Sequence, residues 1–155
     1  MNALRRQPVT LVFCERTGRW AVAWRRVWAR TLRDAGGDTP MRVVETRSVS
    51  ECRETLAEMP SAFVAIELTS TGADKALELL AEVMTRFRDS AAAVLAEDDL
   101  AEYEWLAREI GAAHFISSPR QLPSLVGIVR RHAERTPAQE LELPQEIWAR
   151  LPWGD

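Results

Sequence analysis

The chain contains 155 residues, of which 23 are acidic and 20 are lysine or arginine, for a formal net charge of −3. This length suits one domain with a core of its own, and a near-balanced charge without a basic block is not typical of a protein that binds nucleic acid. In addition, no apolar run is long enough to span a membrane. From the charge and the apolar runs together, we expect neither nucleic acid nor a membrane among the partners.

Strands and helices are predicted to alternate from residue 9 to residue 135. Short apolar runs rich in β-branched or small residues predict strands at residues 9–13, 41–45, 62–66, 91–96 and 113–116. Amphipathic stretches predict a helix after each strand, beginning near residues 20, 48, 74, 98 and 123, and the last of them ends at Arg135. This alternation indicates an α/β fold of three layers, in which helices cover both faces of a parallel sheet.

Local signals support the helix ends. Ser48 or Ser50 is a suitable N-cap for the second helix, and Gly36–Gly37 is a suitable C-terminal stop for the first. On the first helix, Trp20 and Trp24 fall on one face at about 100° per residue. We therefore expect both tryptophans to lie in the core.

The composition changes after residue 135. Residues 136–155 form a polar tail punctuated by prolines, with too few apolar side chains to fold alone. We assign residues 9–135 to the domain and residues 136–155 to a C-terminal tail. Its large apolar side chains, Ile147, Trp148 and Trp153, are predicted to pack onto the domain or onto a second copy of it.

The two cysteines, Cys14 and Cys52, show neither the spacing of a metal site nor that of a disulfide framework. We expect both to be buried and reduced, as is typical of a cytoplasmic protein. Cys14 has no evident base near it in this arrangement, so we do not expect it to act as a nucleophile.

The element order and several short motifs resemble the receiver domains of two-component response regulators. The most specific part is the acidic helix start Asp98–Asp99–Leu100, followed by Gly111–Ala112 and then by residues 115–119, Phe-Ile-Ser-Ser-Pro. The resemblance covers about residues 9–135. It implies a flavodoxin-like, doubly wound sheet of five parallel strands in the order 2-1-3-4-5.

The chemistry of receivers is not matched at their functional positions. Receivers carry two acidic residues after the first strand to hold Mg²⁺, where this chain has Cys14 and Glu15. The phospho-accepting aspartate corresponds to Glu67, the phosphoryl-sensing serine or threonine to Leu95, and the lysine before a proline to Ser118. Because a thiol is a poor ligand for Mg²⁺ and leucine forms no hydrogen bond to a phosphoryl oxygen, the resemblance implies a degenerate receiver, or pseudo-receiver.

Glu67 lies where a buried strand gives way to a loop, at the sheet edge where chemistry collects in such folds. One interpretation is a fixed negative charge that stands in for a phosphorylated aspartate; the other is a solvated carboxylate left after the site decayed. Glu15, Glu67 and Glu97 converge at this edge in the predicted fold, and three carboxylates suit a divalent metal or acid–base catalysis. Without the second aspartate and the lysine of receivers, we predict no metal, no cofactor and no enzymatic activity.

The turn after the first strand offers an alternative function. Arg16–Thr17–Gly18–Arg19 opens a helix, and phosphate-binding loops occupy that place in α/β folds. A flavodoxin-like domain that binds a small ligand or an anion with this turn is the runner-up interpretation. A single Thr-Gly pair is a weak motif, since no glycine-rich fingerprint or P-loop accompanies it.

Trp105 is predicted to lie on the wet face of the fourth helix, nearly opposite the stripe Leu100, Tyr103, Leu106 and Ile110. A large exposed aromatic residue suits a partner site, with Glu102 and Arg108 in its polar rim. The resemblance implies that a protein partner or a homodimer uses the face formed by helix four, strand five and helix five. The alternative is a lone surface aromatic residue covered by the tail.

We therefore predict a protein–protein interaction module in signalling or regulation. The resemblance also implies a cis peptide bond between Ser118 and Pro119, since receivers usually have one before the matching proline.

Overall fold

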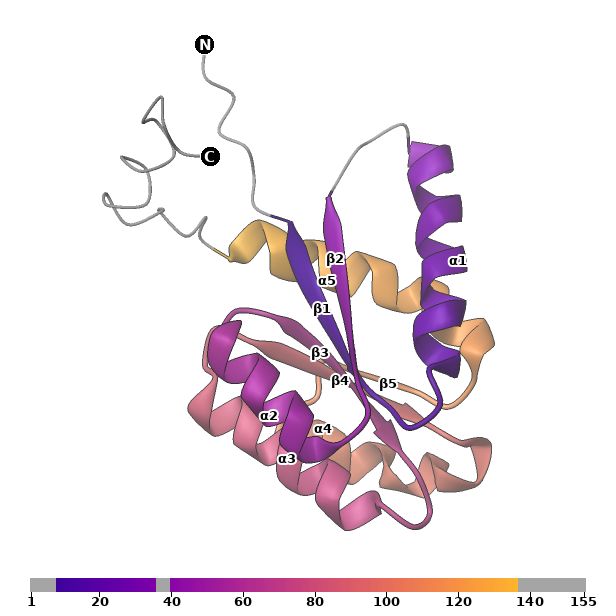
Figure 1. The fold of residues 1–155 in the computed structure, drawn as a ribbon. Coiled ribbons are helices and arrows are strands. Elements are labelled where there is room, and N and C mark those ends of the chain that lie inside the picture. Colours follow the sequence, from indigo (N-terminus) through magenta and orange to yellow (C-terminus); the bar gives the residue numbers. More distant parts are fainter. Residues whose placement is uncertain (1–7, 36–39, 137–155) are drawn as a thin grey trace, which may run out of the picture.

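The computed structural model describes residues 8–35 and 40–136. Five strands form one parallel sheet in the order β2-β1-β3-β4-β5, which confirms the predicted receiver-like, flavodoxin-like topology (Figure 1). The strands are β1 (Val9–Cys14), β2 (Met41–Thr46), β3 (Phe63–Leu68), β4 (Ala91–Ala96) and β5 (His114–Ile116). β3 has a strand on each side and is buried on both faces, as its continuous apolar run predicts.

Helices cover both faces of the sheet, as predicted. The α-helices are α1 (Arg19–Ala35), α2 (Val49–Glu58), α3 (Ala73–Arg86), α4 (Glu104–Ile110) and α5 (Leu122–Arg135), and two short 3₁₀ helices are η1 (Asp98–Tyr103) and η2 (Pro119–Gln121). α1 and α5 pack on one face, and α2, α3 and α4 pack on the other. Of the helices that the structure describes, none has the length and apolar character needed to cross a membrane.

The two faces of the sheet have different cores. The face under α2, α3 and α4 is mainly aliphatic, and both cysteines lie in it. The face under α1 and α5 is rich in aromatic residues: Phe13, Trp20, Trp24 and Trp28 are all buried there. The burial of Trp20 and Trp24 confirms the prediction made from the phase of the first helix.

Ser48 is the N-cap of α2, as one of the two predicted candidates. Its hydroxyl oxygen accepts a hydrogen bond of 3.1 Å from the backbone N–H of Glu51. The predicted stop at Gly36–Gly37 and the predicted packing of Ile147, Trp148 and Trp153 fall outside the described residues.

The fourth helical segment differs from the prediction. Residues 98–103 form η1, and the α-helix begins only at Glu104. A 3₁₀ helix advances about 120° per residue and an α-helix about 100°, so a phase extrapolated from Leu100 fails further along the segment. Leu106, which was predicted to face the core, is 38% exposed. Leu100 is buried, as predicted, and Ala107 is buried beside Leu106.

The prediction of a cis bond before Pro119 is wrong, since no peptide bond in the described residues is cis. Ser118 has an extended backbone, and its hydroxyl accepts a hydrogen bond of 3.3 Å from the N–H of Arg120. Pro119 thereby begins η2 as its first residue, a position where proline needs no N–H partner. The trans bond is compatible with this cap.

Candidate functional site

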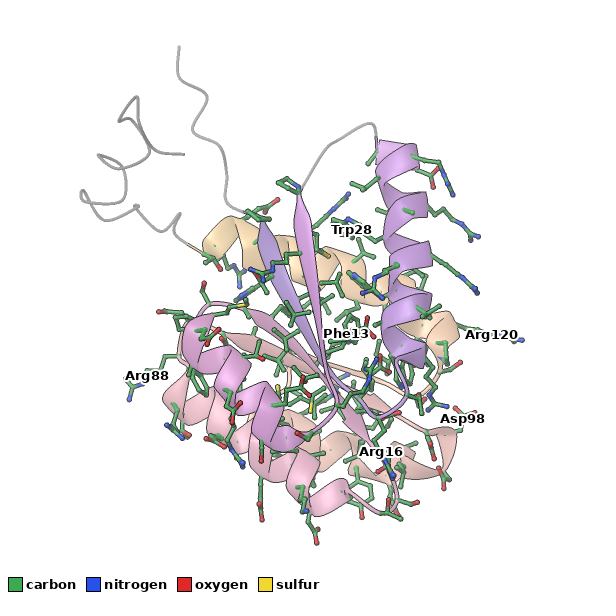
Figure 2. The ribbon with its side chains drawn as sticks, in the orientation of Figure 1. Phe13, Arg16, Trp28, Arg88, Asp98 and Arg120 are labelled. Atoms are coloured by element: carbon green, nitrogen blue, oxygen red, sulfur yellow. The ribbon has the colours of Figure 1, made fainter. Side chains whose placement is uncertain are left out.

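The candidate site lies at the carboxyl edge of the sheet, where β1, β3 and β4 end. β1 and β3 are paired through Cys14 and Ile66, so Glu15, the first residue after β1, lies level with Glu67. Glu67 is still inside β3, which continues to Leu68, and not at the start of the loop as predicted. Glu97 follows β4 directly. Arg16, in the loop after β1, and Asp98, the first residue of η1, lie at this edge and are labelled in Figure 2. As predicted, Glu15, Glu67 and Glu97 lie at the same edge of the sheet. The contacts of their side chains determine what this cluster can bind.

Glu15 uses its carboxylate to cap α1. One oxygen accepts a hydrogen bond of 2.9 Å from the N–H of Trp20, and the other accepts one of 2.9 Å from the N–H of Ala21. The residue is only 2% exposed. A carboxylate at the positive end of a helix satisfies backbone donors that would otherwise lack partners. Glu15 therefore has a structural task and does not extend towards Glu67 as a metal ligand.

Glu67 is held by the loop that follows β1. Its side chain is 7% exposed, and one oxygen accepts a hydrogen bond of 3.0 Å from the N–H of Arg16. The other oxygen lies 3.6 Å from Nε of Arg19. Of the two interpretations of Glu67, the solvated carboxylate is therefore wrong: the carboxylate is enclosed, with one partner from the loop after β1 and one from the first residue of α1.

Arg19 joins two of the three carboxylates. Besides its contact with Glu67, its Nη2 lies 3.5 Å from a carboxylate oxygen of Glu97. The guanidinium also lies 5.4 Å from the ring centroid of Trp20, within the range of a cation–π contact. The site thus contains a cation that belongs to the chain. Sequence reasoning missed this role, although the position of Arg19 at the start of the first helix, beside the third strand, was a signal.

In residues 8–35 and 40–136, no group of three or more histidine, cysteine, aspartate or glutamate side chains gathers in a way that suits a metal ion. At the sheet edge the reason is visible, because Glu15 points to α1 and Arg19 lies between Glu67 and Glu97. A metal would need to displace the guanidinium and compete with the helix cap.

Cys14 belongs to the opposite side of the sheet from Arg19. It is buried in the aliphatic core with Cys52, on the face under α2. The Cys14 thiol donates a hydrogen bond of 3.7 Å to the carbonyl of Ser48. The neighbouring Cys52 thiol lowers the pKa of Cys14, the Cys14 thiol raises the pKa of Cys52, and burial raises the pKa of both. Neither cysteine forms a disulfide, which agrees with the prediction of buried thiols.

Leu95 and Ser118, the other two degenerate positions, have structural roles. Leu95 is fully buried in the aromatic-rich core under α1 and α5. Ser118 caps η2, as described above. Neither side chain contacts Glu67 through a hydrogen bond or an ion pair.

The turn after β1 offers few donors to an anion. The N–H groups of Trp20 and Ala21, which an anion at the start of α1 would use, donate to Glu15. Gly18 has a φ of +82°, and a Cβ there would lie 2.9 Å from Nη2 of Arg47. Glycine therefore serves the tight turn and the close approach of Arg47. These contacts weaken the alternative of a phosphate-binding or flavin-binding loop.

A second candidate site is the surface around Trp105. Trp105 is 71% exposed, as predicted. Leu106 beside it, which was predicted to face the core, is exposed too. Arg108 forms an ion pair of 2.8 Å with Glu104 on the same helix, and Glu102 is exposed on η1. We call these five residues the Trp105 surface. It combines an apolar centre with charged neighbours, as partner sites do.

A shallow polar pocket of about 360 Å³ borders this surface. Its lining consists of Glu104, His114, Phe115, Ser117, Arg120, Gln121 and Ser124, and Arg120 is labelled in Figure 2. The Ser124 hydroxyl donates to the carbonyl of Gln121 at 2.6 Å, so Nε2 of His114, 2.7 Å away, is the donor in its bond to Ser124. Burial and the nearby Arg108 lower the pKa of His114, which favours its neutral form. The serine hydroxyl is therefore not oriented as a nucleophile towards this histidine.

Comparison with known proteins reveals similarity at the level of structure only. By sequence, the chain matches no family model and no curated protein. By structure, it resembles a response regulator from Thermotoga maritima, with a TM-score of 0.62 and 17% identity over 83% of this chain and 99% of the other. A CheY-like protein, TadZ, from Pseudomonas aeruginosa matches with a TM-score of 0.63 and 15% identity over 86% of this chain and 100% of the other.

An orphan response regulator of H. pylori, HP1043, matches with a TM-score of 0.59 and 15% identity, over 83% of this chain and 98% of the other. These proteins have nearly their full length covered by the match. At such low identity the likeness establishes a shared receiver-like fold and does not extend to the roles of individual residues.

Proposed function

We propose that this chain is a pseudo-receiver: a receiver-like signalling module that binds protein through the Trp105 surface and transfers no phosphoryl group. The observation that carries the proposal is the 71% exposure of Trp105, with the exposed Leu106 next to it. Large aromatic side chains supply much of the energy of protein interfaces, because they bury a wide area and freeze few rotamers. The partner is a second copy of the chain or another protein.

The contacts at the sheet edge support the loss of phosphoryl transfer. Attack on a phosphoryl donor needs a free carboxylate oxygen and cations that neutralise the phosphoryl oxygens. One oxygen of Glu67 accepts a hydrogen bond from the N–H of Arg16, the other lies in ionic contact with Arg19, and Arg19 also contacts Glu97. Glu15, at the position of an acidic metal ligand in receivers, is bound to the backbone of α1.

We expect acetyl phosphate with Mg²⁺ to leave the mass of the protein unchanged. Beryllofluoride with Mg²⁺ should likewise leave the tryptophan fluorescence unchanged, because the Glu67 side chain is only 7% exposed and lies beside the guanidinium of Arg19. Intact-mass spectrometry and a fluorescence titration are the measurements, with a phosphorylatable receiver as the positive control. A stoichiometric adduct on Glu67 that depends on Mg²⁺ would disprove this part of the proposal.

Replacing Trp105 with alanine is expected to weaken self-association or partner capture by more than about 1 kcal/mol, which is roughly a fivefold change in affinity. The variant should fold normally, because the exposed side chain contributes little to the core. Sedimentation measures self-association, and capture from native lysate measures binding to another protein. The matched control is Val22→Ala on α1, which removes another exposed apolar side chain, 47% exposed, away from the Trp105 surface.

Two results would contradict the role of Trp105. Unfolding of Trp105→Ala would show that the side chain supports the core, against its observed exposure. If Trp105→Ala changes neither stability nor binding, then the Trp105 surface is not the partner site, and the sheet edge around Glu67 and Arg19 is the better candidate.

A further inference from the structure

A groove between α1 and β2 lies away from both candidate sites. It has a volume of about 340 Å³ and is lined by Trp24, Arg25, Trp28, Ala29, Leu32, Met41 and Val43. We call it the α1–β2 groove; Trp28, in its wall, is labelled in Figure 2. The rings of Trp24 and Trp28 are stacked with their centroids 5.7 Å apart, and Nε1 of Trp24 lies 3.4 Å from Sδ of Met41. Its lining is thus mainly apolar and aromatic.

The groove also borders an edge of the sheet. β2 is the outermost strand and pairs only with β1 in the described sheet. An edge strand beside apolar side chains is a place where natural proteins add a covering segment. Met41 and Val43 are only partly buried, so an apolar side chain in the groove would remove further apolar surface from water.

Three segments of the chain lie outside the described residues and differ in what they offer the groove. Residues 36–39 are Gly-Gly-Asp-Thr and have no large apolar side chain. Residues 1–7 contain Arg5 and Arg6. Residues 137–155 alone combine several large apolar side chains, namely Leu141, Leu143, Ile147, Trp148, Leu151 and Trp153.

Charge favours the C-terminal segment further. α1 contains five arginines and one aspartate. Arg26 and Arg33 are exposed and fall on the flank next to Ala29 at about 100° per residue, so they border the groove. Residues 137–155 contain four acidic residues, Glu140, Glu142, Glu146 and Asp155, against one arginine. The basic flank therefore attracts this segment and repels the arginine-bearing residues 1–7.

The segment starts within reach of the groove. Arg130 of α5 lies over Trp28, with its guanidinium 5.5 Å from the ring centroid. α5 ends at Arg135, five residues further, which is about 8 Å along a helix. An extended chain of the eleven residues 137–147 spans up to about 35 Å. Ile147 and Trp148 can therefore reach the groove from the end of the same α5.

We propose that residues 147–153 dock into the α1–β2 groove of their own chain, with Trp148 or Trp153 against Trp28 and Leu32. The acidic residues that precede them then lie near Arg26 and Arg33. The docked segment covers the exposed side of β2 and leaves the Trp105 surface, on the other side of the sheet, open to a partner.

The test uses the full chain with a nitroxide attached to Ala149→Cys, because the native Cys14 and Cys52 are 7% and 0% exposed and react slowly. In ¹⁵N-labelled protein, the Trp28 indole and the Leu32 and Val43 amides should lose intensity relative to the reduced nitroxide. The control is the same label at Arg88→Cys, an exposed position after α3 labelled in Figure 2, which should leave these signals intact.

Charge reversal provides the second arm. Arg26→Glu with Arg33→Glu should restore most of the lost intensity, while the charge-matched pair Arg88→Glu with Arg120→Glu should not. Unchanged groove signals with the label at residue 149 would overturn the proposal. Broadening of the groove signals that persists when spin-labelled ¹⁴N protein is mixed with ¹⁵N protein that carries no spin label would overturn it too, because the segment would then dock on a second copy.

Discussion

Replacing Glu15 with alanine is expected to lower the free energy of unfolding by about 2–3 kcal/mol. The substitution leaves the N–H groups of Trp20 and Ala21 without their acceptor at a site that is 2% exposed. An unsatisfied buried donor costs about 1–3 kcal/mol, and loss of a helix cap costs about 0.5–2 kcal/mol. Urea denaturation followed by circular dichroism measures the change.

Two variants calibrate this result. Glu15→Gln keeps one acceptor oxygen and should lose less stability than Glu15→Ala. Glu97→Ala removes a carboxylate that is 43% exposed and belongs to a partly solvated ion pair. We expect it to lower the free energy of unfolding by less than about 1 kcal/mol. If Glu15→Ala is no more harmful than Glu97→Ala, then the cap contributes little and Glu15 is free for another task.

Trp24→Ala is expected to destabilise the domain by about 3–5 kcal/mol, the range for large aromatic residues in a core. Trp24 is fully buried, stacks on Trp28 and lies with its ring centroid 6.5 Å from that of Phe13. Its loss leaves a cavity on the α1 side of the sheet that the surrounding rings cannot fill. Such a change is a large part of the 5–15 kcal/mol that stabilises a typical domain.

The matched control is the same substitution at an exposed tryptophan. Trp105→Ala should shift the urea midpoint far less than Trp24→Ala, because Trp105 is 71% exposed. Equal shifts in the two variants would mean that the aromatic-rich core under α1 is not packed as described.

The fold could be predicted because its signals are local. The apolar run of β3 and the N-cap at Ser48 are each visible within a few neighbouring residues, and alternating strands and helices restrict the topology. The exposure of Trp105 was predicted from helical phase, although Leu106 was misplaced. That error came from η1, whose 3₁₀ winding leaves no clear signal in the sequence.

The candidate site could be located but not described from the sequence. Glu15, Glu67 and Glu97 were placed at the correct edge, since strand ends in a parallel sheet meet there. Their partners could not be predicted, because side-chain rotamers and the path of the loop after β1 decide them. The bond from Arg16 to Glu67 and the contact of Arg19 with Glu97 each join residues far apart in the chain. Periodicity describes one element at a time and does not specify such contacts.

The position of Arg19 has a consequence for how this sheet edge responds to its surroundings. A bound metal ion dissociates, and its occupancy follows the ion concentration in solution. The guanidinium between Glu67 and Glu97 is covalently attached to the chain. Each molecule therefore carries one cation at this site, whatever the ionic composition of the solution. Neither a chelator nor a change in divalent-ion concentration removes that cation from the cluster.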